Sequence, residues 1–457
     1  MRARPSAWAR LAAALPAAPR EPWLPALLAR NAEVDYLRHH GSPREAAAFR
    51  DRLPLVSYDD LAPWLADVQR GRADVLFAGT PVAYERTSGS AGPAKLIPYS
   101  AAGLDDFRRA LLPWLVAGAA AYGVTGRVYL SISPATRPRE QLCGVPVGLD
   151  DGAYLGEAAG AILATLSAVP FEVAALTDID AWRAATLAHL KGAHDLELIS
   201  CWSPTFLLRL LDDIEDPVAA WPRLKVVSCW ASAASRPLAA ELAARLPQAR
   251  LQPKGLLSTE CAVTVPDVDG RAVLTPHGFF EFLRDGRALL ATELTRGDVY
   301  EVVATTASGL YRYRTGDFVR CEGFVEERPV LEFLGRDALT SDLVGEKLTE
   351  AFVAECLRDV PGFRMLVPAA DRDGYVLVAE RGACASAEPV ERRLCDNPQY
   401  AYARRLGQLR ALRLFEADRP YDRYVDAQLK SGVRLGDIKP LALRAEPVWF
   451  ETFGGAA

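Results

Sequence analysis

The chain has 457 residues, half of them hydrophobic and 24% charged, which is the composition of an ordinary folded protein with two or three domains. Its 53 basic and 58 acidic side chains give a net charge of −5, and this balance disfavours a nucleic acid or an anionic membrane as the partner. The eight cysteines include no closely spaced pair of the kind that zinc or thioredoxin-type sites need, so we interpret them as buried thiols in a reducing compartment.

No apolar run approaches the ~20 residues of a membrane span. The first apolar run, 11–18, is short and is broken by Pro16, which argues against a secretory signal. We therefore expect a soluble, cytoplasmic protein. Only seven of the basic residues are lysines, a bias typical of a GC-rich bacterial genome, so each lysine that remains is a candidate for a role that arginine cannot fill.

The first 275 residues show two patterns. Residues 1–80 have the three- and four-residue apolar spacing of helices, at 24–40 and 57–71. Between about 125 and 275, short apolar runs alternate with helical stretches; the runs lie at 128–134, 196–202, 224–230 and 251–258, with helices at 204–214 and 237–246. This alternation predicts an α/β architecture with a mostly parallel sheet covered on both faces.

From about 271 to 335, strand-like runs follow one another with only turns between them, which predicts antiparallel strands in a small barrel or sheet appended to the α/β body. A new unit begins after Gly335-Arg336-Asp337. Its expected helices lie at 348–357, 389–406 and 422–430, and its strands at 363–371, 374–382 and 409–417. We expect helices packed on a small antiparallel sheet, and hence two domains, 1–336 and an α+β domain at 337–457.

The stretch Thr87–Lys95 (TSGSAGPAK) has the parts of an anion cradle. Two glycines let backbone amides turn inward, three hydroxyls add donors, and Lys95 ends the run with a cation. The spacing differs from that of the GxxxxGK[ST] loop. A Ser/Gly-rich surface turn is the alternative interpretation.

Ser258-Thr259-Glu260 follows the apolar run at 251–257. A glutamate at the end of a central strand can hold Mg²⁺ while the neighbouring hydroxyls bond a phosphate. A capping box or an exposed loop acid is the alternative.

In the stretch 308–317, alternation places Tyr311 and Tyr313 on one face and Arg312 and Arg314 on the other, with 315–317 as a turn. The carboxylate of Asp317 in that turn suits the two hydroxyls of a ribose. The alternative is an ordinary hairpin with paired charges.

These motifs, followed by Gly335-Arg336-Asp337, by 342–347 (DLVGEK) and by 436–440 (GDIKP), stand in a specific order. In that order, and most closely in GFFEFL (278–283) and YEVVATTASGLYRYRTGDFV (300–319), the chain resembles the acyl-adenylate-forming superfamily. Within it, the chain is similar to the auxin-responsive acyl acid amido synthetases in their shorter bacterial form.

The resemblance implies a role for each matched position. Lys439 would meet the α-phosphate and the acyl carboxylate during adenylation, Glu260 would hold the magnesium, and Asp337 would be the hinge of a mobile C-terminal domain. The remaining ATP-binding positions that the resemblance implies are Thr87, Ser88, Gly89, Ser90, Lys95, Ser258, Thr259, Asp317 and Arg336.

Two positions depart from the family's pattern. Leu256 stands where the wider superfamily has a tyrosine that stacks on adenine, so base stacking would be weaker. Ala91 stands where a hydroxyl is usual, which removes one donor from the phosphate loop.

The pocket for the acyl group is harder to predict from the sequence than the nucleotide site. Chain order places it at 131–137, 202–206 and 230–232, with Ser133, Trp202, Thr205, Trp230 and Ala231 as the candidate contacts. Two tryptophans with small neighbours can form a flat slot for an aryl acid, but core aromatics are the alternative, which we favour for Trp202. His277 is a candidate base toward an amine, although a solvated loop histidine is the more common case.

The leading hypothesis is a ligase that uses ATP and Mg²⁺ to activate a small carboxylic acid as its acyl-AMP and then passes the acyl group to an amine, an amino acid by resemblance. Transfer to a thiol of coenzyme A or a carrier protein is the first alternative, and a non-catalytic nucleotide sensor is the second. The resemblance is compatible with a hormone-modifying role or with specialised metabolism. The acid, the amine and any partner protein do not follow from the sequence.

Overall fold

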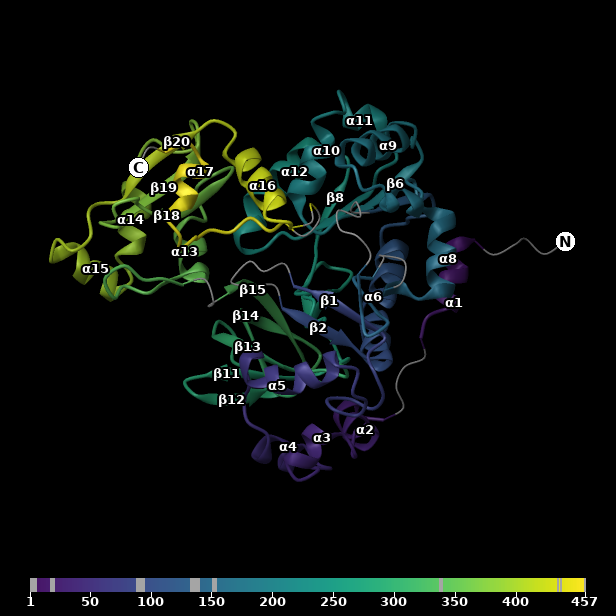
Figure 1. Ribbon diagram of the computed structural model, residues 1–457. Coiled ribbons are helices and arrows are strands. Elements are labelled where there is room, and N and C mark those ends of the chain that lie inside the picture. The colour runs from purple at the N-terminus through teal and green to yellow at the C-terminus, as the bar shows by residue number, and fades with distance from the viewer. Residues whose placement is uncertain are drawn as a thin grey trace.

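The computed structural model describes residues 6–455 apart from 17–20, 88–94, 132–139, 150–153, 337–339, 434 and 436–437, and it describes only the backbone of Ile179, Thr205 and Ala234. In Figure 1 the C-terminal unit and a parallel-sheet unit lie side by side at the top, above an antiparallel sheet and the helices of residues 23–69. None of the described helices combines the length and the apolarity that a bilayer crossing requires.

The helices predicted for the first 80 residues are present. They are α1 (Ala7–Ala13), α2 (Trp23–Arg30), α3 (Asp35–His39), α4 (Ala46–Arg52) and α5 (Tyr58–Gln69). Helix α5 begins at Ser57, where the side chains of Ser57 and Asp60 form a reciprocal capping box that satisfies two free backbone amides. The apolar faces of α2 to α5 pack against the stretch that contains Tyr311 and Tyr313.

The predicted parallel sheet is confirmed. Its strands are β3 (Arg127–Leu130), β6 (Leu196–Ser200), β7 (Val226–Cys229) and β8 (Arg250–Pro253), all parallel and in the order β3-β6-β7-β8. One face packs against α1, α6 (Ala101–Ala121) and α8 (Glu157–Leu166), and the other packs against α9 (Ile179–Lys191), α10 (Pro204–Leu211) and α12 (Arg236–Arg245). Because both faces are covered, the central strands β6 and β7 are buried along almost their whole length rather than in alternation. Short helical turns α11 (Pro217–Ala220), η1 (Phe171–Ala175) and η2 (Ala233–Ser235) complete the unit.

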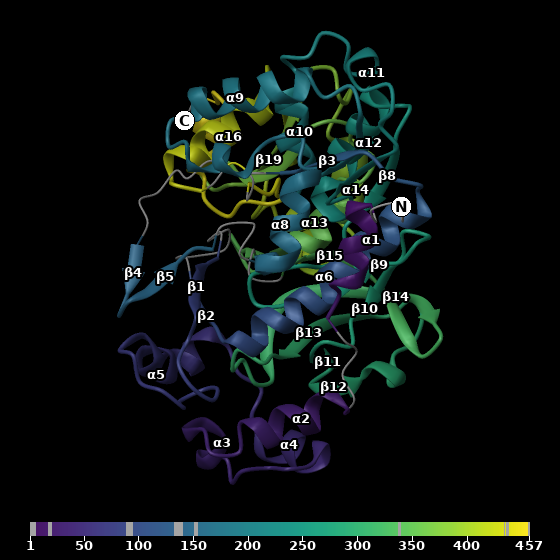
Figure 2. The ribbon, with the colours of Figure 1, turned by 90° about the vertical axis from the view of Figure 1, so that its right-hand side faces the viewer.

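The strands after residue 264 form an open seven-stranded antiparallel sheet with the order β12-β11-β13-β14-β15-β10-β9. Their bounds are β9 (Thr264–Pro266), β10 (Ala272–Leu274), β11 (Phe279–Arg284), β12 (Arg287–Leu290), β13 (Val299–Thr305), β14 (Tyr313–Val325) and β15 (Arg328–Arg336), with η3 (Ala291–Glu293) after β12. Of the predicted barrel or sheet, the sheet is observed, because the edge strands β12 and β9 do not pair with each other. A second, mixed sheet that the sequence analysis did not predict joins β2 (Leu96–Tyr99), β1 (Ala83–Arg86), β5 (Val145–Val147) and β4 (Glu140–Leu142), and the β4–β5 hairpin stands out in Figure 2.

The predicted turn at 315–317 is wrong. These three residues lie inside β14, opposite the single residue Val302 of β13, so they form a bulge in which Gly316 has a φ of +72°. The paired-charge alternative holds for the two arginines before it, because Arg312 pairs with Glu281 and Arg314 with Glu301. A bulge re-aims side chains, and here it frees the 317 side chain from the regular alternation.

The C-terminal unit contains β16 (Thr340–Ser341), β17 (Leu348–Thr349), α13 (Glu350–Cys356), β18 (Arg364–Pro368), β19 (Tyr375–Glu380), α14 (Glu388–Leu394), α15 (Pro398–Arg405), β20 (Arg413–Ala417), α16 (Pro420–Lys430) and α17 (Val448–Thr452). Its sheet is not wholly antiparallel as predicted: β18 and β19 are antiparallel, but β20 runs parallel to β19. The two helices between β19 and β20 form the crossover that a parallel pair requires. The single helix predicted at 389–406 is broken, because Asn397 caps α15 and Pro398 occupies its first position.

One cluster of buried side chains runs from the parallel-sheet unit into the C-terminal unit. It joins α10 and α12 to β18, β19 and α16. At its edge, Arg209 of α10 forms an ion pair of 2.6 Å with Asp422 of α16 and lies 5.8 Å from the ring centroid of Tyr421. Apolar packing therefore holds the C-terminal unit against the parallel sheet in this arrangement.

Candidate active site

Two adjacent cavities open at the carboxyl ends of the parallel strands, the edge at which open α/β sheets bind ligands. The larger has a volume of about 240 Å³ and the smaller about 70 Å³. Their linings share Trp230, Leu257, Ser258 and Lys439. These four residues therefore mark the place where the two cavities meet.

The smaller cavity contains an ion pair between two predicted site residues. The Asp317 carboxylate, which is 1% exposed, accepts hydrogen bonds from Nε and Nη2 of Arg336 at 2.6 and 3.4 Å. The Asp317 charge, and after it that of Glu260, raises the pKa of the Arg336 guanidinium despite its burial. The carboxylate remains an acceptor with lone pairs to spare, which suits a diol such as a ribose.

Beside this ion pair, Leu256 and Phe333 line the same cavity with apolar side chains. Leu256 packs in the antiparallel sheet's core cluster, against which Phe333 is packed. The sequence analysis identified Leu256 as a weak surface for a base but missed Phe333, which lies in the predicted strand run VLEFLGR without a motif of its own. The cavity thus offers one aromatic and one aliphatic side chain next to a polar ion pair, a combination that fits a nucleoside.

The structure brings Lys439 from the C-terminal unit to the junction of the two cavities. Its ammonium lies 4.6 Å from the ring centroid of Trp230. Tyr424 of α16 donates a hydrogen bond of 2.7 Å to the Lys439 carbonyl, and Ile438 is buried in the shared apolar cluster. The backbone on both sides of the lysine is therefore fixed by packing, which positions a cation where reacting groups from both cavities would meet.

The stretch 258–260 is held by its own hydrogen bonds. Ser258 and Cys261 exchange backbone and side-chain hydrogen bonds of 3.0 to 3.3 Å, and the Tyr99 hydroxyl donates to the Thr259 carbonyl at 2.5 Å. The Glu260 side chain is 5% exposed. Its charge raises the pKa of the neighbouring Tyr99, Cys261 and Tyr313, each of which is raised first of all by burial. Glu260 is therefore a buried carboxylate rather than the exposed loop acid of the alternative interpretation.

The first and last residues of the predicted phosphate loop, Thr87 and Lys95, are hydrogen-bonded to each other. The Thr87 amide donates to the Lys95 carbonyl at 2.9 Å, and the Lys95 amide donates to the Thr87 hydroxyl at 3.0 Å. The Lys95 ammonium donates to the Tyr313 hydroxyl at 3.0 Å, which links the loop to the 308–317 motif. Ser88, Gly89 and Ser90 lie outside the described residues.

Trp202 and Trp230 line the larger cavity with ring centroids 6.0 Å apart, so the core interpretation that we favoured for Trp202 is wrong. Ala231 lines neither cavity and packs instead against the apolar cluster shared with the C-terminal unit. Ser133, Asp337 and the side chain of Thr205 lie outside the described residues. His277 lines neither cavity; it is half-buried and not solvated as expected, and burial lowers its pKa to about 4.

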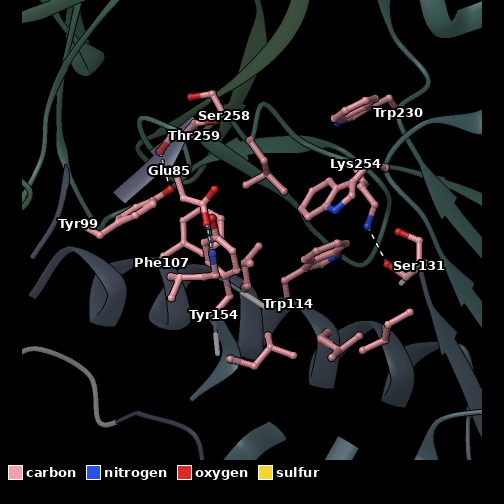
Figure 3. Close-up of a pocket in the computed structure, with 18 of the residues that line it drawn as sticks. Glu85, Tyr99, Phe107, Trp114, Ser131, Tyr154, Trp230, Lys254, Ser258 and Thr259 are labelled. Carbon is pink, nitrogen blue, oxygen red and sulfur yellow. Dashed lines mark hydrogen bonds between the residues drawn. The ribbon is translucent and has the colours of Figure 1, made fainter. Parts of the chain in front are cut away.

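The larger cavity also has lining residues that the sequence analysis missed. Figure 3 shows Glu85, Tyr99, Phe107 and Tyr154 gathered at one end and Trp114 and Lys254 at the other, beside Ser131, which lies within the predicted range 131–137. Phe107 and Trp114 lie on α6, where an apolar helix face gives the same signal whether it covers a core or a cavity. The scarcity of lysine was the one available signal for Lys254.

Three comparisons with known proteins bear on this site. The model of the GH3 family N-terminal domain matches residues 12–217, and that of the GH3 family central domain matches 272–336, together more than half of the chain. The chain belongs to the GH3 family. The chain is 26% identical over 416 residues to the probable indole-3-acetic acid-amido synthetase GH3.1 of Oryza sativa subsp. japonica, and the match covers 71% of this chain and 67% of that protein. A shorter match, 39% identical over 95 residues, is to the jasmonoyl-L-amino acid synthetase JAR6 of Nicotiana attenuata, and covers 19% of this chain and 16% of that protein.

Solved structures show the same fold. The AtGH3.15 acyl acid amido synthetase in complex with 2,4-DB has a TM-score of 0.82 at 16% identity and covers 94% of this chain and 92% of its own. A 2-hydroxyisobutyryl-CoA ligase has a TM-score of 0.52 at 14% identity, with coverages of 89% and 92%. The predicted GH3 family, the α/β fold class with an appended antiparallel sheet, and the enzyme class, an acyl acid amido synthetase, are confirmed.

Proposed function

We propose that this GH3 protein adenylates a small carboxylic acid at the junction of its two cavities and then transfers the acyl group to an amino acid. The observation that carries the proposal is the position of Lys439, which lines both the cavity with the Asp317–Arg336 pair and the aromatic cavity. ATP would place its ribose and base in the smaller cavity, and the acid would occupy the larger. Their reacting groups would then meet beside the Lys439 ammonium.

The chemistry requires a cation at this point. A carboxylate oxygen attacks the α-phosphorus, the bond from that phosphorus to the bridging oxygen breaks, and pyrophosphate leaves. Two anions approach each other in this step, and the Lys439 ammonium offsets their repulsion and the charge that develops on the phosphate. In the second step the amine attacks the acyl carbon and loses a proton, and AMP leaves with the oxygen of the broken acyl–phosphate bond.

Glu260 supports the proposed magnesium. The described residues contain no group of three or more His, Cys, Asp or Glu side chains arranged around one point, so the ion would rest on Glu260 and on phosphate oxygens. This is the usual way in which Mg²⁺ binds at nucleotide sites, with one or two carboxylates and the phosphates of the substrate, where it neutralises their charge. Thr87, Ser88, Gly89, Ser90, Lys95, Ser258 and Thr259 remain the proposed phosphate contacts.

Glu85 supports an amine as the acceptor. Its buried carboxylate receives a hydrogen bond from the Leu149 amide and one from the Tyr154 hydroxyl, and in Figure 3 it lies at the same end of the larger cavity as Thr259. A carboxylate attracts the positively charged ammonium group of an incoming amino acid, whereas an uncharged thiol has no charge for it to attract.

The proposal includes the division into domains 1–336 and 337–457, with Asp337 as the hinge between half-reactions. It also includes a bacterial source, which the lysine-poor composition supports, a cytoplasmic location and a role in specialised metabolism.

The test is carboxylate-dependent exchange of labelled pyrophosphate into ATP, with aryl, indolyl and aliphatic acids as substrates. Lys439→Ala is expected to reduce exchange by about 10²- to 10³-fold, whereas Lys430→Ala, which removes an exposed lysine of the same C-terminal unit, leaves it unchanged. Equal exchange in Lys439→Ala would contradict the mechanism. The mass of the product formed with amino acids or with coenzyme A separates an amine from a thiol acceptor, and a protein that forms no AMP with any acid would be the non-catalytic sensor.

A further inference from the structure

Lys254 is a buried cation inside the larger cavity. It follows the end of β8, lines the cavity and is only 6% exposed. Its ammonium donates a hydrogen bond of 2.7 Å to the Ser200 hydroxyl and lies 4.7 Å from the ring centroid of Trp114 and 4.8 Å from that of Trp202. The proposed adenylation mechanism gives this lysine no role.

No carboxylate of the described residues neutralises Lys254. Its side-chain contacts are one hydroxyl and two indole rings, and the nearby thiols of Cys201 and Cys229 are kept neutral by burial, which raises their pKa. Burial lowers the pKa of Lys254 to about 8, so the ammonium form still predominates at neutral pH. A buried positive charge without an anion is costly, and cation–π contacts offset only part of that cost.

The position of Lys254 relative to the reacting end of the cavity decides what it can contact. In Figure 3, Thr259 and Glu85 lie at one end of the cavity, and Lys254 lies at the other, beside Ser131. Lys439 contacts Trp230 and Lys254 contacts Trp202, and the two ring centroids lie 6.0 Å apart. An acid whose carboxyl group reaches Lys439 would therefore lie along these two indoles toward Lys254. Lys254 therefore faces the part of the acid farthest from the bond that forms.

The tryptophans define the shape of such an acid. Trp114, Trp202 and Trp230 supply flat apolar surfaces, which favour a ring over a flexible chain. A cavity of ~150 Å³ already holds benzene, so about 240 Å³ accommodates a ring with a substituent or a fused second ring.

We propose that Lys254 determines specificity, by selecting flat aromatic acids that carry an oxygen acceptor at the end remote from the reacting carboxyl group. This inference rests on the proposed function, because it takes the larger cavity to be the acyl site. The acceptor is a hydroxyl, carbonyl or carboxylate oxygen, and a carboxylate gains most because it also neutralises the buried ammonium.

The test compares acids that differ only in this remote group. The one-ring series is benzoate, 4-hydroxybenzoate and terephthalate, and the two-ring series is 2-naphthoate and 6-hydroxy-2-naphthoate. Dissociation constants come from calorimetry and kcat/KM from pyrophosphate exchange, for the wild-type enzyme and for Lys254→Met, which keeps the length of the side chain and removes its charge. Lys191→Met, at an exposed position at the end of α9, is the control for losing one positive charge.

In at least one series, the wild-type enzyme is expected to prefer the oxygen-bearing acid about tenfold to a hundredfold, the range of a charge-assisted hydrogen bond. Lys254→Met should reduce the preference to less than about threefold while the unsubstituted acid binds as before, and Lys191→Met should keep it. A preference for terephthalate over 4-hydroxybenzoate would identify charge pairing as the larger component. If the role of Lys254 were purely structural, Lys254→Met would instead weaken the binding of all the acids to the same extent.

The preference of the wild-type enzyme is measured without any variant, so the proposal can be refuted even if the Lys254→Met protein does not fold. Exchange without a preference in either series, or a preference that Lys254→Met retains, overturns the inference and leaves the proposed function intact. Binding with the preference but without exchange would instead overturn the adenylation mechanism and keep the role of Lys254.

Discussion

Glu350 allows a quantitative test of how the C-terminal unit is joined to the antiparallel sheet. It is the first residue of α13, is 3% exposed, and its Oε1 accepts a hydrogen bond of 3.1 Å from the Ala442 amide, three residues after Lys439. The backbone of Arg336, at the end of β15, also hydrogen-bonds to it. One carboxyl group therefore ties the segment that carries Lys439 to the last strand of the sheet.

Burial raises the pKa of Glu350 from 4.5 to about 7, against the opposing effect of these hydrogen bonds and of nearby arginines. A raised pKa means that the folded protein binds the proton more tightly than the unfolded chain, so stability falls as the pH rises from about 4.5 to 7 and stays lower above that range. The shift of about 2.5 units corresponds to about 3 kcal/mol at ~1.4 kcal/mol per unit. Glu350→Gln removes the titration and should relieve this cost at high pH.

The assay is thermal unfolding of the ligand-free protein at pH 5 and pH 8. The midpoint of Glu350→Gln minus that of the wild type is expected to increase by roughly 5 °C between the two pH values, at about 2 °C per kcal/mol. Glu355→Gln makes the same change on the exposed face of the same helix and should show no such increase. A difference that is equal at pH 5 and pH 8 would refute the reasoning, because it would mean that Glu350 ionises as freely in the folded protein as in the unfolded chain.

Three further outcomes follow from the site. Asp317→Asn should raise the KM for ATP by about tenfold or more and leave the KM for the acid unchanged, since it weakens the proposed ribose contact and the pair with Arg336, both in the smaller cavity; an equal rise in both KM values would place Asp317 elsewhere. The preference of the wild-type enzyme for terephthalate over benzoate should be full below pH 8 and decline above it, because the Lys254 ammonium loses its proton there. The adjacent thiols do not contribute to this change, since burial raises the pKa of Cys201 to about 12 and that of Cys229 well above its usual value. A preference that does not change with pH would contradict the assignment. Gly255→Ala would place its Cβ 2.0 Å from a carbonyl oxygen at the start of β9, and should lower the free energy of unfolding by about 1–3 kcal/mol; denaturant unfolding with an unchanged midpoint would show that this approach is not as close as the structure has it.

The parallel sheet was predictable because β6 and β7 are short runs of mostly apolar residues and each is followed by a helical stretch. The antiparallel strands were predictable for a related reason, since only turn residues separate them. The bulge at Asp317 was not, because a glycine between two polar residues gives the same local signal in a turn and in a bulge. The strand β20 was predicted, but its parallel direction was not, because pairing between strands separated by two helices depends on tertiary packing.

The residues of the candidate site also fall into those that could be predicted from the sequence and those that could not. Lys439, Asp317 and Arg336 lie in motifs with an order along the chain, and the structure brings all three to the smaller cavity. Trp114 and Lys254 belong to no motif, because an acyl pocket is shaped by side chains from several elements whose convergence no local pattern records. Specificity is therefore harder to predict from a sequence than the chemistry of the nucleotide.

The apolar cluster shared by the parallel sheet and the C-terminal unit bears on the order of the two proposed half-reactions. In this arrangement the cluster and the Arg209–Asp422 pair hold the C-terminal unit with Lys439 at the junction of the two cavities. The proposed rotation of the C-terminal unit for the second half-reaction would expose this apolar surface to water. On that proposal, packing favours the arrangement for adenylation, and the energetic barrier that it sets would fall between the two steps, while the activated acid is still enclosed.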